Sequence, residues 1–230
     1  MSDTVHFRPA TFTFLKDLAA HNDREWFAAN KERYEAYVKE AGIEFVADFG
    51  TYLAKLSPHF VADTRPVGGS LFRIYRDTRF AKDKTPYKTN TGMQFRHEAA
   101  KDVHAPGYYL HLEPGACFAG IGIWQPDTPT VTKIRDAIVA DPAAWKRAAY
   151  GKGFTDVLSL GDEDRLTKPP RGYDPRHPYA EDLKRKSFTA GSRFTQKQVT
   201  SPGFIDEYAR VCTAGTPFMK FLCDAVGVPF

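Results

Sequence analysis

The chain has 230 residues, of which 42% are hydrophobic, 26% charged and 14% aromatic, and its formal net charge is +4. This composition is that of an ordinary soluble protein, and no stretch approaches the roughly 18 uninterrupted apolar residues that a membrane span needs. The mild positive charge permits a nucleic-acid or phosphorylated partner without requiring one. We expect no membrane contact.

The location is expected to be cytoplasmic. The N-terminal residues show no basic segment followed by an apolar run, so no secretory signal is expected. The three cysteines, Cys117, Cys212 and Cys223, are few and odd in number. They predict neither a disulfide framework nor a paired-cysteine zinc site, and a reducing compartment suits them.

Helices are expected over most of the first 57 residues. Thr11 is placed to cap a short helix, and Asn22 with Glu25 three residues later resembles a capping box. Apolar residues then recur at helical spacing from residue 26 to residue 56. Pro58 ends this helical region.

Strands are expected in the middle of the chain, at residues 71–76, 89–96, 107–113 and 117–124. The segment Glu113-Pro114-Gly115-Ala116 is a tight-turn signal, which predicts that the last two strands pair as a hairpin. Strands that follow one another through short connections favour an antiparallel or mixed sheet over a doubly wound parallel sheet.

Helices return after this region. Thr128-Pro129 and Asp141-Pro142 are helix starts, as are Ser201-Pro202 and Thr216-Pro217. Between these pairs lie a long loop at residues 161–179 and one more candidate strand at 186–195. The prediction is a single α+β domain over residues 1–230, in which a central antiparallel or mixed sheet is flanked by N-terminal and C-terminal helices.

Residues 71–88, LFRIYRDTRFAKDKTPYK, are the most distinctive part of the chain. They hold six basic and two acidic residues, so their net charge of +4 equals that of the whole protein. Aromatic residues interleave with the charges, which a merely solvated charge run would not need. Cations held in fixed places suit an anionic ligand, because an arginine fork binds phosphate or carboxylate through two hydrogen bonds and lysine acts as a point charge. The alternative is a surface hairpin whose charges pair with acids elsewhere.

In a strand at 71–76, alternation would place Arg73 and Tyr75 on one face, with Phe72 and Ile74 on the other and in the core. The predicted ligand-binding residues, from this segment and from the neighbouring strands, are Arg73, Tyr75, Arg76, Arg79, Lys82, Asp83, Lys84, Tyr87, Lys88, Tyr109 and Trp124.

The strand at 107–113 places Tyr109, His111 and Glu113 on one face. A histidine beside a carboxylate can be a general base with its orienting partner, or a pair of metal ligands, or simply the polar side of a half-exposed strand. With Asp77, His111 and Glu113 are the candidate catalytic residues. The sequence has no His-Glu-x-x-His, phosphate-loop or Gly-x-Ser-x-Gly motif, and no metal site is predicted.

A second basic region spans residues 165–197, with nine basic and three acidic residues. If it lies beside residues 71–88, the two regions form a broad positive surface of the kind that follows a polyanion. If it lies on the far side, it is only a solvated face.

Residues 71–88 resemble the signature of the domain of unknown function 2461 family. Residues 22–27, NDREWF, are similar to its N-terminal helix start, and residues 108–114, YYLHLEP, to the strand that follows the signature. Residues 119–122, AGIG, depart from the adjacent glycines typical of the family there. The resemblance covers nearly the whole chain and implies no activity.

Three functions are compatible with these residues. The first is an enzyme or binding domain for a phosphorylated or otherwise anionic small molecule, which predicts a closed pocket around Arg73 and His111. The second is a nucleic-acid-binding module that uses regions 71–88 and 165–197, which predicts an open groove joining them. The third is a non-catalytic interaction protein whose basic segment binds an acidic partner.

Overall fold

The computed structural model describes residues 3–99 and 105–230 of the chain. Within them the strands form one six-stranded sheet in which every neighbouring pair is antiparallel. In spatial order the strands are β1 (Phe60–Val61), β2 (Thr91–His97), β3 (Gly107–Leu112), β4 (Cys117–Ile123), β6 (Phe188–Phe194) and β5 (Ser159–Leu160). The predicted α+β domain with an antiparallel sheet is therefore confirmed.

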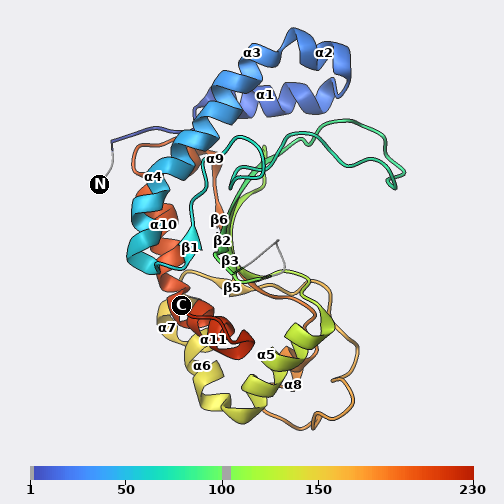
Figure 1. Ribbon diagram of the computed structural model, residues 1–230, viewed down its shortest axis with the longest axis vertical. Coiled ribbons are helices and arrows are strands. Elements are labelled where there is room, and N and C mark those ends of the chain that lie inside the picture. Colours follow the sequence, from blue (N-terminus) through green and yellow to red (C-terminus); the bar gives the residue numbers. More distant parts are fainter. Residues whose placement is uncertain (1–2, 100–104) are drawn as a thin grey trace.

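Helices precede the first strand, follow the last, and also lie between β4 and β6 in the chain (Figure 1). The N-terminal group is α1 (Pro9–Ala20), α2 (Arg24–Ala29), α3 (Lys31–Tyr34), the π-helix η1 (Glu35–Glu40) and α4 (Ala41–Leu56). The later helices are α5 (Thr128–Ala140), α6 (Pro142–Tyr150), α7 (Lys152–Thr155), α8 (Ala180–Leu183), α9 (Gln196–Val199), α10 (Phe204–Ala214) and α11 (Thr216–Val226). In the described part of the chain, none of these helices has the length and apolar character needed to cross a bilayer.

The main core lies between the sheet and helices α4, α10 and α11; Figure 1 shows α4 and α10 on one side of the sheet and α11 at its lower end, near α5 and α6. Alternate strand residues such as Met93, Phe95, Tyr108 and Leu110 are fully buried there. Because side chains alternate along a strand, the residues between them point to the opposite side of the sheet, here called the second face. Tyr109 and His111 lie on it.

The N-terminal helices enclose a smaller core. Phe14, Phe27 and Tyr34 pack there with Ile74 and Tyr87 of the basic segment. Burial of these two apolar residues fixes the base of the segment against α1, α2 and α3.

Several predicted helix boundaries differ from the observed ones. Helix α1 begins at Pro9, so Thr11 lies in its first turn instead of capping it. Helix α2 is capped by Asp23 and not by Asn22: the Asp23 carboxylate accepts the backbone N–H of Trp26 at 2.8 Å. Helix α10 begins at Phe204, after Gly203 at φ 76°. The starts at Asp141 and Thr216 are as predicted.

Residues 71–76 do not form the predicted strand. Only isolated bridges occur, Leu71 with Met93 and Tyr75 with Tyr87. The chain turns back on itself, because Arg76 N–H donates to the Pro86 carbonyl at 2.9 Å and Lys88 N–H to the Ile74 carbonyl at 2.8 Å. Residues 71–88 are thus an irregular hairpin, called here the basic hairpin.

The expected alternation fails in this hairpin. Within residues 71–76, Leu71 and Ile74, three residues apart, are the buried positions, and Phe72 lies on the second face instead of in the core.

Candidate functional site

Three side chains on the second face form a directed chain of hydrogen bonds. Tyr109 and His111 come from β3, and Glu113 follows its last residue. The Tyr109 hydroxyl lies 2.9 Å from His111 Nδ1, and His111 Nε2 lies 3.3 Å from Glu113 Oε2. Thr89 adds a hydroxyl donor to Glu113 Oε1 at 3.3 Å. Strand alternation predicts this shared face, and the structure adds the contacts.

The carboxylate sets the direction of this chain. Glu113 can only accept when ionised, so His111 donates from Nε2 and leaves Nδ1 to accept the Tyr109 proton. Burial raises the pKa of Tyr109 to about 12, and the charge of Glu113 adds to the effect. At neutral pH Tyr109 is therefore a protonated phenol, and it donates to His111 Nδ1 when the imidazole is neutral and carries its proton on Nε2. We call Tyr109, His111 and Glu113 the relay.

Aromatic rings and a glycine hold the relay in place. The His111 ring stacks on Phe118 of β4 with ring centres 4.7 Å apart, and the Tyr109 ring packs against Phe72 of the basic hairpin at 5.9 Å. A Cβ added to Gly92 of β2 would lie 2.5 Å from the Tyr109 hydroxyl. Glycine at this position is therefore what lets the phenol lie over the neighbouring strand.

One cation of the basic hairpin, Lys88, is connected to the relay through Phe72. The Lys88 ammonium is 5.3 Å from the centre of the Phe72 ring, which in turn contacts Tyr109. Lys88 is half-buried, and burial lowers its pKa, with the neighbouring charge of Arg73 acting in the same direction. Among the described residues, neither Lys88 nor Arg73 forms an ion pair.

Most other charged residues of the basic hairpin form ion pairs or hydrogen bonds with one another. Arg76 pairs with Asp83 at 2.5 Å and also contacts Thr85, while Arg79 pairs with Asp77 at 2.7 Å. The Arg79 guanidinium and then its backbone N–H lower the pKa of Asp77 to about 2. The pKa of Asp83 is lowered to about 2 by the backbone N–H of Thr85 first and then by Arg76. The structure thus places Asp77 in an ion pair at the end of the hairpin and not with His111 and Glu113.

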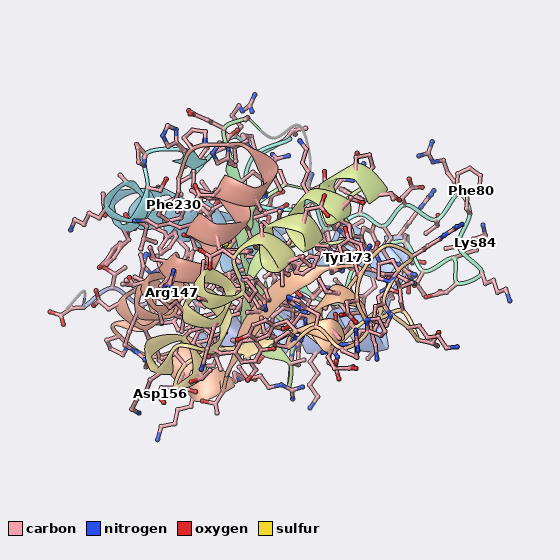
Figure 2. The ribbon with its side chains drawn as sticks, turned by 90° about the horizontal axis from the view of Figure 1, so that it is seen from below. Phe80, Lys84, Arg147, Asp156, Tyr173 and Phe230 are labelled. Atoms are coloured by element: carbon pink, nitrogen blue, oxygen red, sulfur yellow. The ribbon has the colours of Figure 1, made fainter. Side chains whose placement is uncertain are left out.

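Lys84, Phe80 and Lys82 also lie at the end of the hairpin. Lys84 donates to the Thr78 carbonyl at 2.8 Å. Phe80 is 94% exposed, with the Arg79 guanidinium 5.9 Å from its ring centre. Figure 2 shows Phe80 and Lys84 where the hairpin projects from the rest of the molecule. Lys82 is exposed there as well. These residues are separate from the relay.

The remaining predicted ligand-binding residues divide in the same way. Tyr87 is buried, and its ring stacks on Phe27 with centres 4.1 Å apart, so its role is to anchor the hairpin. Tyr75 is half-exposed beside it. Trp124 is half-exposed just beyond the end of β4.

The second basic region is largely a structural network. Lys184 pairs with Glu181 and Lys186 with Asp164. The buried pair of Arg185 and Asp182, 2.9 Å apart, is completed by Trp145 Nε1 and the Tyr150 hydroxyl, both of which donate to Asp182. In the described ranges, the basic residues of this region left without an ion pair are Lys168, Arg171, Arg193 and Lys197.

One cavity, the acidic and metal-binding residue types, and the cysteines were compared with the relay as candidate sites. A cavity of about 330 Å³ lies away from the relay, among Asp63, Arg65, Arg96 and Glu98. Arg65 there is paired with Asp63, and Glu98 with His59. Residues 3–99 and 105–230 contain no group of three or more His, Cys, Asp or Glu side chains suited to a metal ion. The three cysteines are buried and free, and burial raises the pKa of each thiol.

Sequence reasoning missed the residues that frame the relay. The contact with Phe118 could have been predicted, because a tight turn at Pro114-Gly115 sets His111 opposite Phe118, and the structure has this register. The contacts with Thr89, Gly92 and Phe72 could not have been predicted, because they depend on how the irregular hairpin meets β2.

Comparison with known proteins adds the family and nothing on chemistry. No curated protein and no solved structure gives a significant match. The model of the family described as "Conserved hypothetical protein (DUF2461)" matches residues 10–221, which confirms the resemblance carried by residues 71–88, and the chain belongs to this family.

Proposed function

We propose that this protein binds a phosphorylated or otherwise anionic small molecule on the second face of its sheet and acts on it by proton transfer. One observation carries the proposal. A hydrogen-bonded relay of phenol, imidazole and carboxylate packs against Phe72, whose other neighbour is the ammonium of Lys88, a half-buried cation with no ion-pair partner among the described residues. A cytoplasmic location, in keeping with free buried cysteines, belongs to the same proposal.

The anion would bind Lys88 and Arg73. A half-buried ammonium with no carboxylate partner has lost part of its hydration without compensation. The lowered pKa of Lys88 reflects this loss of hydration. An anionic ligand would supply the missing opposite charge, and Arg73 would add the planar fork that suits phosphate and carboxylate.

The relay would move the proton. When the Tyr109 oxygen accepts a proton from the bound ligand, its own proton passes to His111 Nδ1. The imidazolium formed is stabilised by Glu113, which already accepts from Nε2. In the reverse direction, Tyr109 acts as an acid of high pKa.

Nucleic-acid binding is the second candidate. Figure 1 supports it, because the basic hairpin and the segment that contains residues 161–179 extend to the same side of the sheet from opposite ends. The ion pairs within both basic regions weaken it, since they leave fewer cations for phosphates.

Binding at low salt separates these functions. Thermal shift and calorimetry would be run with inorganic phosphate, sugar phosphates, nucleotides, carboxylic acids, and short DNA and RNA. For a small-anion site, Lys88→Gln and Arg73→Gln abolish the response. Lys82→Gln, which removes the same charge from the end of the hairpin, leaves it intact. His111→Gln keeps binding and loses turnover.

Two results would contradict the proposal. Equal losses from Lys88→Gln and Lys82→Gln, with binding only to oligonucleotides and a steep salt dependence, would establish the nucleic-acid function. No response to any anion in the panel would favour a non-catalytic interaction protein.

A further inference from the structure

Arg193 of β6 lies in the same row of the second face as the histidine of the relay. The strand register sets His111 of β3 opposite Phe118 of β4, and it sets Phe118 opposite Arg193. Directly opposite residues of neighbouring strands point to the same face of a sheet. Phe194, the next residue of β6, is buried in the main core. Arg193 therefore points to the second face, on the same side of the sheet as the relay.

The basic hairpin joins this row at its other end. The Phe72 N–H donates to the Gly92 carbonyl of β2 at 2.9 Å, and Gly92 pairs with His111. The Tyr109 hydroxyl also belongs to the row, because a Cβ on Gly92 would lie 2.5 Å from it. In spatial order the row consists of Phe72, Gly92 with the Tyr109 hydroxyl over it, His111, Phe118 and Arg193.

The relay thus has a cation on each side, and one phenylalanine separates it from each of them. On the hairpin side, Phe72 packs against the tyrosine of the relay, and the Lys88 ammonium is 5.3 Å from the centre of the Phe72 ring. On the β6 side, Phe118 stacks on the histidine of the relay with ring centres 4.7 Å apart, and Arg193 is the residue opposite Phe118.

The charge of Arg193 is not balanced by an acid of the sheet. Among the residues that the structure describes, the strands contain no aspartate or glutamate. Glu113, which follows β3, is engaged by His111 and Thr89. Arg193 is exposed and has no ion pair within the described ranges. Its planar guanidinium is therefore available to a carboxylate or phosphate of a ligand, which it can bind through two hydrogen bonds.

The distance between the two cations determines what kind of ligand can reach both. Three strand spacings separate β2 from β6, which places their backbones about 14 Å apart. Even with both long side chains inclined towards the relay, anionic groups bound at the two ends would be about 10 Å or more apart. A small ion at Lys88 is too short to contact Arg193, whereas a longer ligand with a charge at each end can contact both.

We infer that the ligand of this site is an elongated molecule with an anionic group at each end, and that Arg193 binds the second of these groups. The first group binds Lys88 and Arg73. The part of the ligand between the two charges lies across the Tyr109 hydroxyl and His111, where the relay acts on it. The inference rests on the proposed function and adds the class of its ligand.

The test uses α,ω-dicarboxylates of different length, titrated by calorimetry at low salt. Sebacate and dodecanedioate carry carboxylates at both ends of a long chain, whereas succinate carries them close together. Decanoate has the chain length of sebacate and only one carboxylate. We expect sebacate or dodecanedioate to bind about tenfold or more tightly than both succinate and decanoate, which is the discrimination that one charge-assisted contact can supply.

Substitutions of Arg193 locate this preference. Arg193→Gln should bring the affinity for the long dicarboxylates down to that for decanoate and leave the binding of inorganic phosphate unchanged. Because Arg193 is exposed, the melting temperature should stay within a few degrees. Arg193→Lys keeps the charge and should keep most of the preference. Arg147→Gln is the matched control, because it removes the same charge from an exposed position of α6, which Figure 2 shows well away from Phe80 of the hairpin.

The outcomes separate the two proposals. If inorganic phosphate binds but the long dicarboxylates bind no more tightly than decanoate, the inference fails while the anion site stands. If Arg193→Gln leaves the preference intact, or Arg147→Gln removes it equally, Arg193 is not the second contact and the inference fails. If inorganic phosphate and every carboxylate fail to bind, the proposed function fails as well. Should Arg193→Gln unfold the protein, NMR of the wild type decides: the Arg193 side-chain N–H signal should shift with sebacate and stay in place with inorganic phosphate.

Discussion

Asn22 holds Tyr87 by both backbone polar groups, across 65 residues of sequence. Its Nδ2 donates to the Tyr87 carbonyl at 2.9 Å, and its Oδ1 accepts the Tyr87 N–H at 3.0 Å. The Asn22 side-chain amide thus takes the place of a neighbouring strand's backbone for Tyr87, at the base of the basic hairpin. Because Lys88 is the next residue after Tyr87, these hydrogen bonds also fix the backbone position of Lys88.

Replacing Asn22 by alanine should loosen the hairpin. The change leaves a backbone donor and acceptor of the buried Tyr87 unpaired, which costs about 1–3 kcal/mol. Urea unfolding should show this loss, and limited proteolysis within residues 77–84 should become faster. Asp23→Ala is the matched control: it removes the cap of α2 and costs about 1 kcal/mol without changing proteolysis of the hairpin. Unchanged proteolysis in Asn22→Ala would show that the hairpin is anchored elsewhere.

Gly92→Ala should displace the phenol of the relay. The added Cβ would lie 2.5 Å from the Tyr109 hydroxyl, so the Tyr109 ring must move and its bond to His111 must break. Overpacking of this kind costs about 1–3 kcal/mol. Urea unfolding measures the loss, and the Tyr109 ring signals in an NMR spectrum should shift while those of distant Tyr150 stay in place. A variant of wild-type stability with unmoved Tyr109 signals would contradict the geometry.

The central β3–β4 pair of the sheet could be predicted because its signals are local, whereas the two-residue edge strands β1 and β5 are too short to show an alternation. Alternation and the turn at Glu113-Ala116 determine the β3–β4 hairpin, whose Ala116 N–H donates to the Glu113 carbonyl at 3.0 Å. The same alternation predicts that Tyr109, His111 and Glu113 share a face. That their atoms meet as one chain depends on side-chain orientation, which Phe118 and Gly92 fix from the neighbouring strands.

The basic hairpin was harder to predict because its charges pair with one another. The count of six cations predicts a large anion site, but Asp77 and Asp83 each form an ion pair with an arginine of the same segment. The interleaved aromatic residues predict ordered cations. Two of these aromatic residues do hold Lys88 in place: its ammonium lies over the Phe72 ring, and the preceding residue, Tyr87, stacks on Phe27. The path of the turn decides which cations lack an ion pair. Because the turn is irregular, that path cannot be predicted from the spacing of residues in the sequence.

Lys88→Met should stabilise the protein at neutral pH while it removes anion binding. The folded-state pKa of Lys88 is lower than its ordinary value of 10.5, mainly through burial. The unfolded chain therefore binds more protons between these two values, and the stability of the wild type rises with pH across that range. Below the range, the charged side chain destabilises the fold; methionine has no charge to desolvate.

The measurement is the urea midpoint from pH 7 to pH 10.5. We expect Lys88→Met to unfold at higher urea than the wild type at pH 7, and the difference to shrink as the pH approaches 10.5. Lys82→Met, at an exposed position, should leave the midpoint unchanged at every pH. If Lys88→Met were less stable at pH 7, the lysine would already be compensated in the free protein, and the argument for a missing anion would fail.

The tautomer of His111 gives the most direct view of the relay. With Glu113 accepting from Nε2, the neutral ring should carry its proton on Nε2, and nitrogen-15 NMR of the imidazole distinguishes the two tautomers. Glu113→Ala removes the acceptor, so the ring should become a mixture of tautomers. Tyr109→Phe removes only a donor to Nδ1, so the Nε2–H form should persist. A wild-type ring protonated on Nδ1 would reverse the direction of the relay, because Tyr109 would then have to accept from histidine and could not donate to it.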